Sequence, residues 1–68
     1  MTGGPVIVSV RARLVEEGGK FREEWTSYVM DETRQVIYES PVCDNESLAR
    51  YGAFLYCKLN QYKIKKIN

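Results

Sequence analysis

The sequence contains no histidine, which removes the side chain most often used as a general base or a metal ligand near neutral pH. Its two cysteines, Cys43 and Cys57, cannot build a zinc site without carboxylates or a second chain. Neither Gly3-Gly4 nor Gly18-Gly19 precedes a predicted helix, so the sequence has no phosphate-binding glycine loop. We therefore expect no enzymatic activity, no catalytic residue, no metal or cofactor, and no small-molecule substrate.

Signals for export and for membrane insertion are absent as well. The apolar run Val6–Val10 is short, is interrupted by Ser9 and has no basic residue before it, unlike a secretory signal peptide. No stretch approaches the roughly 18 apolar residues of a membrane span. Two cysteines are too few for a disulfide scaffold, and Cys43, just before a predicted helix, is expected to be a structural thiol. The sequence thus predicts a cytoplasmic protein with free thiols and no membrane contact.

The chain is small, and its charge is unevenly distributed. Its 68 residues, 44% of them hydrophobic, predict a single globular domain, 1–68. A chain of this size buries only about 60% of its unfolded surface, so its stability is marginal unless a partner or a second copy contributes. The net charge is +1, but residues 1–57 carry all nine acidic residues, whereas residues 58–68 carry four lysines and no acid. This distribution predicts a basic C-terminal segment on an acidic body.

The first two strands are predicted by alternation on both sides of a glycine turn. Residues Val6–Val15 alternate as a half-buried strand does, and Gly18-Gly19 supplies the positive φ that a two-residue hairpin turn requires. With these glycines as the loop, a small residue lies opposite the only tryptophan, and a basic residue lies opposite an acidic one. The predicted pairs are Val8 with Val29, Val10 with Ser27, Ala12 with Trp25, and Arg13 with Glu24.

The next turn adds a third strand on the same principle. A turn centred on Glu32-Thr33 keeps the apolar residues of the third strand on the face that holds Trp25. Neither central residue is Gly or Asn, so a four-residue loop, which leaves the same side chains on each face, fits equally. The predicted pairs are Val29 with Val36 and Ser27 with Tyr38. We expect a three-stranded antiparallel sheet over residues 6–40, after a flexible leader of residues 1–5.

Residues 44–61 are predicted to form one helix, because Ser40-Pro41 ends the third strand and Asp44 suits the helix N-cap. The apolar stripe of this helix consists of Leu48, Gly52, Leu55, Leu59 and Tyr62, with Tyr51 and Tyr56 beside them. We expect this stripe to cover the Trp25 face, with Gly52 against the Trp25 ring. Residues 62–68 form either a basic tail or a short strand. The predicted fold class is α+β: a three-stranded antiparallel meander followed by one helix packed on one sheet face, with room for a short C-terminal fourth strand.

One helix covers only one face of the sheet, which leaves an opposite face. We call it the reverse face, and it consists of Ile7, Ser9, Arg11, Arg13, Thr26, Tyr28, Met30, Ile37 and Glu39. Its apolar members are expected to stay largely exposed in a monomer, and an apolar patch rimmed by charge commonly marks an interface. An equally open alternative is a solvated sheet face that tolerates scattered apolar residues. The predicted partner-binding residues of this face are Arg11, Arg13, Tyr28, Met30 and Ile37.

Two further groups could contact partners. Phe54 is predicted to project from the polar side of the helix, where it is a candidate anchor for a protein partner unless the leader or the tail folds over it. The C-terminal lysines could hold a nucleic-acid backbone, with stacking on Tyr62, but they would not read base sequence. These lysines are Lys58, Lys63, Lys65 and Lys66.

The order of the predicted elements resembles a known fold. Three antiparallel strands, followed by a helix that opens with Asp44-Asn45-Glu46-Ser47-Leu48-Ala49, resemble the first half of a ribonuclease-H-like fold. They are also similar to the truncated version of this fold in some antitoxins. The strand Val6–Val15 contains no Asp, so this resemblance implies a non-catalytic descendant. Small phage-encoded proteins that block host enzymes look similar too, as compact strand-rich modules that present charge. These resemblances concern the fold of most of the chain and do not establish its function.

Together these observations predict a non-enzymatic binding or regulatory module. It would act by protein–protein contact through the reverse face, as an inhibitor or adaptor of a larger protein or as a homodimer. The alternatives are a nucleic-acid-binding protein that uses the basic C-terminal segment and a small structural subunit of an assembly.

Overall fold

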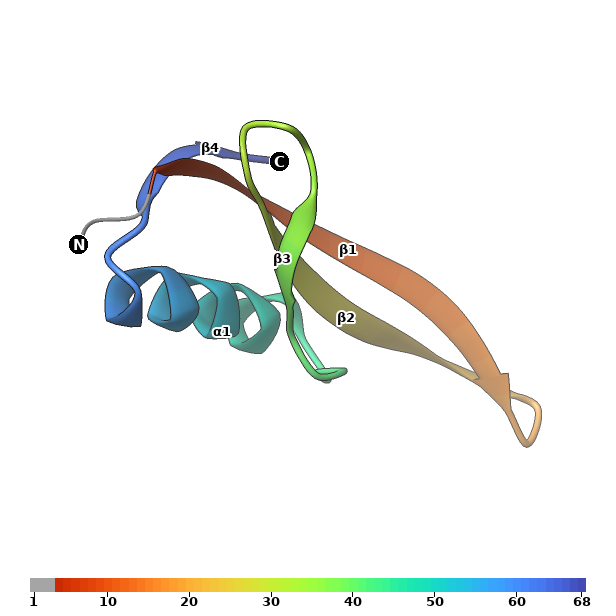
Figure 1. The fold of residues 1–68 in the computed structure, drawn as a ribbon. Coiled ribbons are helices and arrows are strands. Elements are labelled where there is room, and N and C mark those ends of the chain that lie inside the picture. The colour runs from red at the N-terminus through yellow and green to blue at the C-terminus, as the bar shows by residue number, and fades with distance from the viewer. Residues whose placement is uncertain (1–3) are drawn as a thin grey trace.

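Two long antiparallel strands dominate the computed structural model, which describes residues 4–68 (Figure 1). β1 spans Pro5–Glu17 and β2 spans Lys20–Met30. Between them, Gly18 and Gly19 have φ angles of 60° and 79°, which glycine adopts without steric cost. Residues 1–3 of the predicted leader lie outside the described residues, and Pro5 already belongs to β1. The register confirms the predicted pairs, which are Val8 with Val29, Val10 with Ser27, Ala12 with Trp25, and Arg13 with Glu24.

Two short strands flank this pair. β3 spans Val36–Glu39 and pairs antiparallel with β2, whereas β4 spans Lys63–Ile67 and pairs parallel with β1. The strand order in the described part of the chain is β3-β2-β1-β4. Beyond β4, the Asn68 N–H donates to the Val8 carbonyl oxygen at 2.7 Å. The C-terminal segment is therefore a short fourth strand rather than a tail.

The register between β2 and β3 differs from the predicted one. Val29 pairs with Tyr38 rather than with Val36, and the pairing shifts at a bulge that leaves Ile37 without a partner residue on β2. Tyr38 lies on the same face as Val29, as predicted, whereas Val36 pairs with Met30 and therefore lies on the reverse face. The predicted pairs of Val29 with Val36 and of Ser27 with Tyr38 are wrong because the connecting loop, residues 31–35, is longer than a two-residue turn.

Asp31 organises this longer loop. Its Oδ1 accepts hydrogen bonds from the Thr33 hydroxyl at 2.6 Å, from the Thr33 N–H at 2.9 Å and from the Gln35 N–H at 3.0 Å. Arg34 takes a φ of 68° in the same loop. Such side-chain bonds to following backbone groups are how aspartate stabilises turns. The bonds to Thr33 hold the pKa of the Asp31 carboxyl below its usual value, and the bond from Gln35 contributes further.

The helix is shorter than predicted and begins at a different cap. α1 spans Glu46–Leu59, and the Asn45 side chain, not that of Asp44, accepts the Leu48 N–H at 2.9 Å. The chain just before the helix is still paired with β2, because Cys43 and Trp25 exchange backbone hydrogen bonds of 2.8 and 2.9 Å. This pairing keeps the chain extended up to Cys43, and Asn45 then provides the cap.

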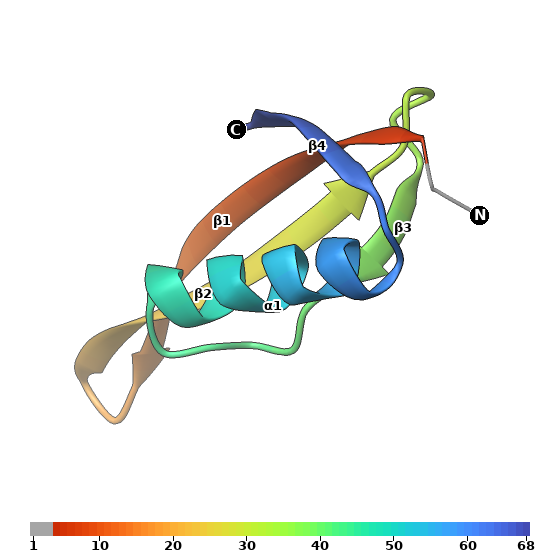
Figure 2. The same cartoon turned by 90° about the vertical axis from the view of Figure 1, so that its left-hand side faces the viewer.

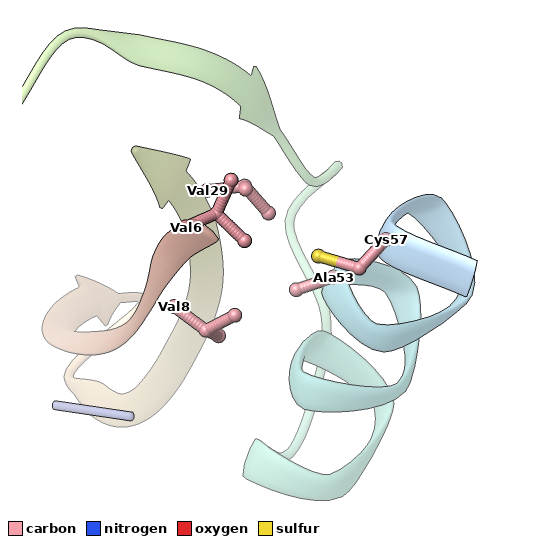
Figure 3. Packing of buried hydrophobic residues seen from close by; sticks show 5 residues of the cluster. All are labelled: Val6, Val8, Val29, Ala53 and Cys57. Carbon is pink, nitrogen blue, oxygen red and sulfur yellow. The ribbon is translucent and has the colours of Figure 1, made fainter. Parts of the chain in front are cut away.

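The core lies between α1 and the face of β1 and β2 that was predicted to be covered (Figure 2). It is built from small side chains, which Figure 3 shows between the two layers: Val6, Val8, Val29, Ala53 and Cys57. Trp25 is half-buried on the same face but lies outside this cluster. A Cβ atom at Gly52 would meet Tyr38 and Ser40 and no atom of Trp25, so the predicted position of Gly52 against Trp25 is wrong.

The β1–β2 pair extends well past the other strands as a hairpin arm, residues 11–24 (Figure 1). The Cα radius of gyration is 13.3 Å, whereas a compact chain of this length would have about 11 Å. Leu14 and Phe21 on this arm are 66% and 63% exposed. The arm therefore elongates the molecule and adds nothing to the buried core.

Candidate interaction surfaces

The outer side of α1 carries a row of large apolar side chains that are exposed. We call this row the outer stripe: Leu48, Tyr51, Leu55 and Leu59, with exposed fractions of 54%, 63%, 40% and 73%. The prediction that these residues cover the sheet is wrong. The residues of α1 that are buried instead are Ala49, Ala53 and Cys57.

The small residues face the sheet because they allow the helix to approach it closely. At 3.6 residues per turn, the row Ala49, Ala53 and Cys57 lies roughly 150° around the helix from the outer stripe. Gly52 lies at the edge of the buried row, where a Cβ atom would lie 3.3 Å from the Tyr38 Oη and 3.7 Å from the Ser40 Cβ. Large leucines at the buried positions would hold the helix farther from Val8 and Val29 and leave voids.

Tyrosines close one side of the helix–sheet interface. The rings of Tyr38 and Tyr56 stack with centroids 4.4 Å apart, and those of Tyr56 and Tyr62 stack at 5.9 Å. The Tyr56 hydroxyl donates to the Ile37 carbonyl oxygen at 3.4 Å, and burial raises the pKa of this hydroxyl. All three rings are half-buried against the core, so Tyr56 and Tyr62 do not extend the outer stripe.

Phe54 and Ile37, both predicted as partner-binding residues, pack against the core and are half-buried. Phe54 does so because the helix is rotated relative to the predicted orientation, which turns its supposed polar side partly toward the sheet. Ile37 does so because the bulge in β3 takes it out of the simple alternation. The prediction that Phe54 projects freely and the prediction that Ile37 stays largely exposed are both wrong.

The reverse face is less exposed than predicted. Ile7, Tyr28 and Met30 are half-buried rather than largely exposed, and Ser9 is only 2% exposed. β4 adds a neighbour beside Ile7, which pairs with Lys66, whereas Tyr28 and Met30 lie on β2 with β1 on one side and β3 on the other. Among the predicted contact residues of this face, Arg11 and Arg13 are the exposed ones.

β4 also brings lysines onto the reverse face. Lys63 pairs with Pro5 and Lys66 pairs with Ile7, so both lie on the same side of the sheet as Arg11 and Arg13. Lys58 lies on α1, and Lys65 falls at the register shift within β4. Two of the four lysines predicted to contact nucleic acid, Lys63 and Lys66, thus lie on the same sheet face as the two arginines and Tyr28. We call this set the basic face: Arg11, Arg13, Tyr28, Lys63 and Lys66.

An ion-pair ladder crosses the reverse side of the hairpin arm. Arg13 pairs with Glu24 at 2.9 Å, as predicted, and Arg22 pairs with Glu24 at 3.0 Å and with Glu17 at 3.1 Å. The hydrogen bond that Arg22 donates to the Glu17 carboxylate, and then the charge of Glu24, raise the pKa of Arg22. Within residues 4–68, Arg11 has no ion-pair partner. The arm is thus largely neutralised, and the free positive charge of the basic face lies toward β4.

Neither thiol has the surroundings of a nucleophile. Cys57 is 2% exposed, and burial raises the pKa of its thiol. Cys43 is half-buried, and its Sγ donates to the Pro41 carbonyl oxygen at 3.3 Å.

An open hollow of about 330 Å³ lies between the start of β1 and the β2–β3 loop, and Asp31, Ile37 and Tyr62 line part of it. The Asp31 Oδ1 there already accepts the three hydrogen bonds that hold the loop.

The part of the chain that the structure describes holds no group of three or more metal-ligating side chains. None of its helices is long and apolar enough to cross a membrane. Comparisons of the chain with known protein families, with curated proteins and with solved structures found no match.

Proposed function

We propose that this protein is a non-enzymatic binding module that docks on another protein through the outer stripe of α1. The observation that carries this proposal is the exposure of four large apolar side chains, between 40% and 73%, along one side of one helix. An amphipathic helix whose apolar residues recur at three- and four-residue steps is a common element of protein recognition, where it lies in an apolar groove. Burial of such a stripe by a partner is favourable by about 25 cal/mol per Å² of apolar surface.

The outer stripe is a better protein-docking surface than the reverse face. The apolar residues of the reverse face are already half-buried, whereas those of the outer stripe are mostly free. Leucine and tyrosine side chains that are buried at an interface also supply more apolar contact than the arginines of the reverse face do. A module of this kind acts by occupying a surface of its partner, as an inhibitor, an adaptor or a subunit of an assembly does. Its free thiols favour a reducing cytoplasm.

Site-specific photocrosslinking in cells of the source organism tests this function. The photoreactive amino acid benzoylphenylalanine replaces Tyr51 in one variant and Phe21 on the hairpin arm in the other. The two positions are a matched pair, because each is an aromatic residue that is 63% exposed. We expect irradiation to yield a discrete protein adduct from position 51 and none from position 21, and we expect Leu55→Lys to remove the adduct.

The outcome separates docking from accidental contact. Equal adducts from both positions, or an adduct at position 51 that survives Leu55→Lys, would contradict docking by the outer stripe. The circular dichroism spectrum and the unfolding midpoint of Leu55→Lys serve as the control for folding. Leu55 is exposed, so its substitution should leave both unchanged.

A second candidate function, nucleic-acid binding, is favoured by one specific observation. The register of β4 places Lys63 and Lys66 on the same sheet face as Arg11 and Arg13, with Tyr28 among them. Basic side chains follow a phosphate backbone, and an aromatic ring gives a base a surface on which to stack. The contact would be weak and independent of base sequence, because the basic face offers no row of side chains that read base edges.

Fluorescence anisotropy with a labelled single-stranded oligonucleotide tests this second function. We expect binding at low salt that weakens steeply as salt rises, and a clear loss of affinity in the double variant Arg11→Gln/Lys66→Gln. The double variant Arg34→Gln/Lys58→Gln is the control, since it removes the same charge away from the basic face. Equal losses in the two variants, or no binding at low salt, would count against this function.

A further inference from the structure

We infer that the partner of the outer stripe is a second copy of this chain, docked with the two α1 helices antiparallel. This inference rests on the proposed function of the outer stripe and names its occupant. The geometry that carries it is the symmetry of the stripe and the distribution of charge along α1.

The outer stripe is self-complementary about its own middle. It begins with Leu48, ends with Leu59 and has Tyr51 and Leu55 between them, over roughly 16 Å of helix at 1.5 Å per residue. A two-fold axis through the middle places Leu48 of one copy level with Leu59 of the other. The same axis places Tyr51 within one residue of the level of Leu55, an offset of about 1.5 Å along the helix. Each contact then occurs twice, as the two-fold symmetry of a homodimer requires.

The charges at the two ends of α1 select the antiparallel orientation. Asp44 lies just before the helix and Lys58 lies in its last turn, whereas Glu46 in the first turn is already paired with Arg50 of the same helix. An antiparallel pair brings the acidic beginning of one helix beside the basic end of the other, and it also opposes the two helix dipoles. A parallel pair would place like charges side by side at both ends. Charge complementarity across an interface orients the partners in this way.

The surface available sets the expected strength of association. The molecule exposes 5070 Å², and an interface of about a tenth of that area would bury roughly 500 Å² on each copy. The total stays below the roughly 1,200 Å² at which stable complexes begin. The dimer should therefore form reversibly, with a dissociation constant in the micromolar range or weaker.

Sedimentation equilibrium over concentrations from about 5 µM to about 1 mM tests this proposal directly. We expect the average mass to rise from the 7.9 kDa of one chain toward twice that value. Leu55→Lys should stay at the mass of one chain throughout. Leu14→Lys on the hairpin arm introduces the same charge at a site that is 66% exposed, and it should associate as the wild type does.

A charge exchange tests the orientation. Asp44→Lys alone or Lys58→Asp alone should weaken association several-fold at low salt, because each brings like charges together at both ends of the dimer. The double variant Asp44→Lys/Lys58→Asp should restore it, because the ends become complementary again. Asn45 still caps the helix in all three variants, and circular dichroism checks that the helix remains. A double variant as weak as the single ones would overturn the antiparallel arrangement.

The two proposals, docking through the outer stripe and a second copy as its partner, can be contradicted separately. A wild-type chain that keeps the mass of one copy at the highest concentration would overturn the second copy as partner. A crosslink from position 51 to a different protein would then leave the docking function of the outer stripe standing. Association that Leu55→Lys does not change would contradict both.

Discussion

Gly52 on α1 faces the hydroxyl of Tyr38 on β3 so closely that a Cβ atom at residue 52 would lie 3.3 Å from the Tyr38 Oη. The Ser40 Cβ would be the next atom, at 3.7 Å. Glycine in the middle of a helix costs about 1 kcal/mol relative to alanine. This close approach explains why the helix carries it at the point where α1 passes β3.

The first prediction concerns this contact. Gly52→Ala gains helix propensity but pushes against the Tyr38 hydroxyl, so we expect it to change the free energy of unfolding by less than about 0.5 kcal/mol. In a Tyr38→Phe background the hydroxyl is gone, and the same substitution should stabilise by about 0.5–1 kcal/mol. Urea unfolding of the four proteins of this double-mutant cycle measures the coupling. An equal effect of Gly52→Ala in both backgrounds would show that the hydroxyl does not oppose the Cβ.

The hairpin was predictable because its determinants are local. Gly18 and Gly19 set the turn, and a period of two residues along each strand then determines which side chains meet. The pairs Ala12–Trp25 and Arg13–Glu24 follow from these two facts without any knowledge of the rest of the fold. The same holds for the position of a helix after Pro41, which the sequence marks by the loss of alternation and by cap residues.

The face of α1 that packs on the sheet was not predictable in the same way. The helix has two rows at helical spacing, one of large apolar residues and one of small ones, and the hydrophobic pattern alone favours the large row. The choice of Ala49, Ala53 and Cys57 depends on how close the sheet lies, which is a tertiary property. The same reason explains the errors at Phe54 and Ile37. The position of Ile37 also depends on the bulge next to the loop of residues 31–35, which Asp31 holds by hydrogen bonds. The residue types alone do not reveal this bulge.

The second prediction concerns the helix cap. Asn45→Ala removes the side chain that accepts the Leu48 N–H and should lower the free energy of unfolding by about 1 kcal/mol. Asp44→Ala is the matched control, because its carboxylate makes no cap hydrogen bond in the described residues, and it should cost only a few tenths of a kcal/mol. Thermal unfolding followed by circular dichroism compares the two. A larger loss from Asp44→Ala would show that the cap is one residue earlier in solution.

The third prediction concerns two buried serines on neighbouring segments. The Ser40 Oγ accepts the Ser27 N–H at 2.9 Å, whereas the Ser27 Oγ is buried with no partner among the described residues. Ser40→Ala leaves a buried N–H without an acceptor and should destabilise by about 1–3 kcal/mol. Ser27→Ala removes an unpaired hydroxyl from the core and should be neutral or stabilise by up to about 1 kcal/mol. Urea unfolding of both variants measures their free energies of unfolding. A larger loss of this free energy in Ser27→Ala than in Ser40→Ala would contradict the prediction.

The fourth prediction concerns acid stability. The hydrogen bonds from Thr33 and Gln35 hold the pKa of Asp31 below that of an unfolded chain. The folded state therefore binds a proton at this carboxyl less readily than the unfolded state does. Its contribution to stability is complete above the unfolded pKa, near 4, and disappears as the pH falls through the lower folded pKa.

We therefore expect the free energy of unfolding to fall more gently between about pH 5 and pH 2 in Asp31→Asn than in the wild type. Asparagine keeps an acceptor oxygen for the loop, so this variant should fold and should differ mainly in its slope against pH. Glu32→Gln is the control, because Glu32 accepts no hydrogen bond among the described residues, and its slope should match that of the wild type. Urea unfolding at a series of pH values gives the slopes. Equal slopes for Asp31→Asn and the wild type would mean that the loop hydrogen bonds do not favour the charged carboxylate.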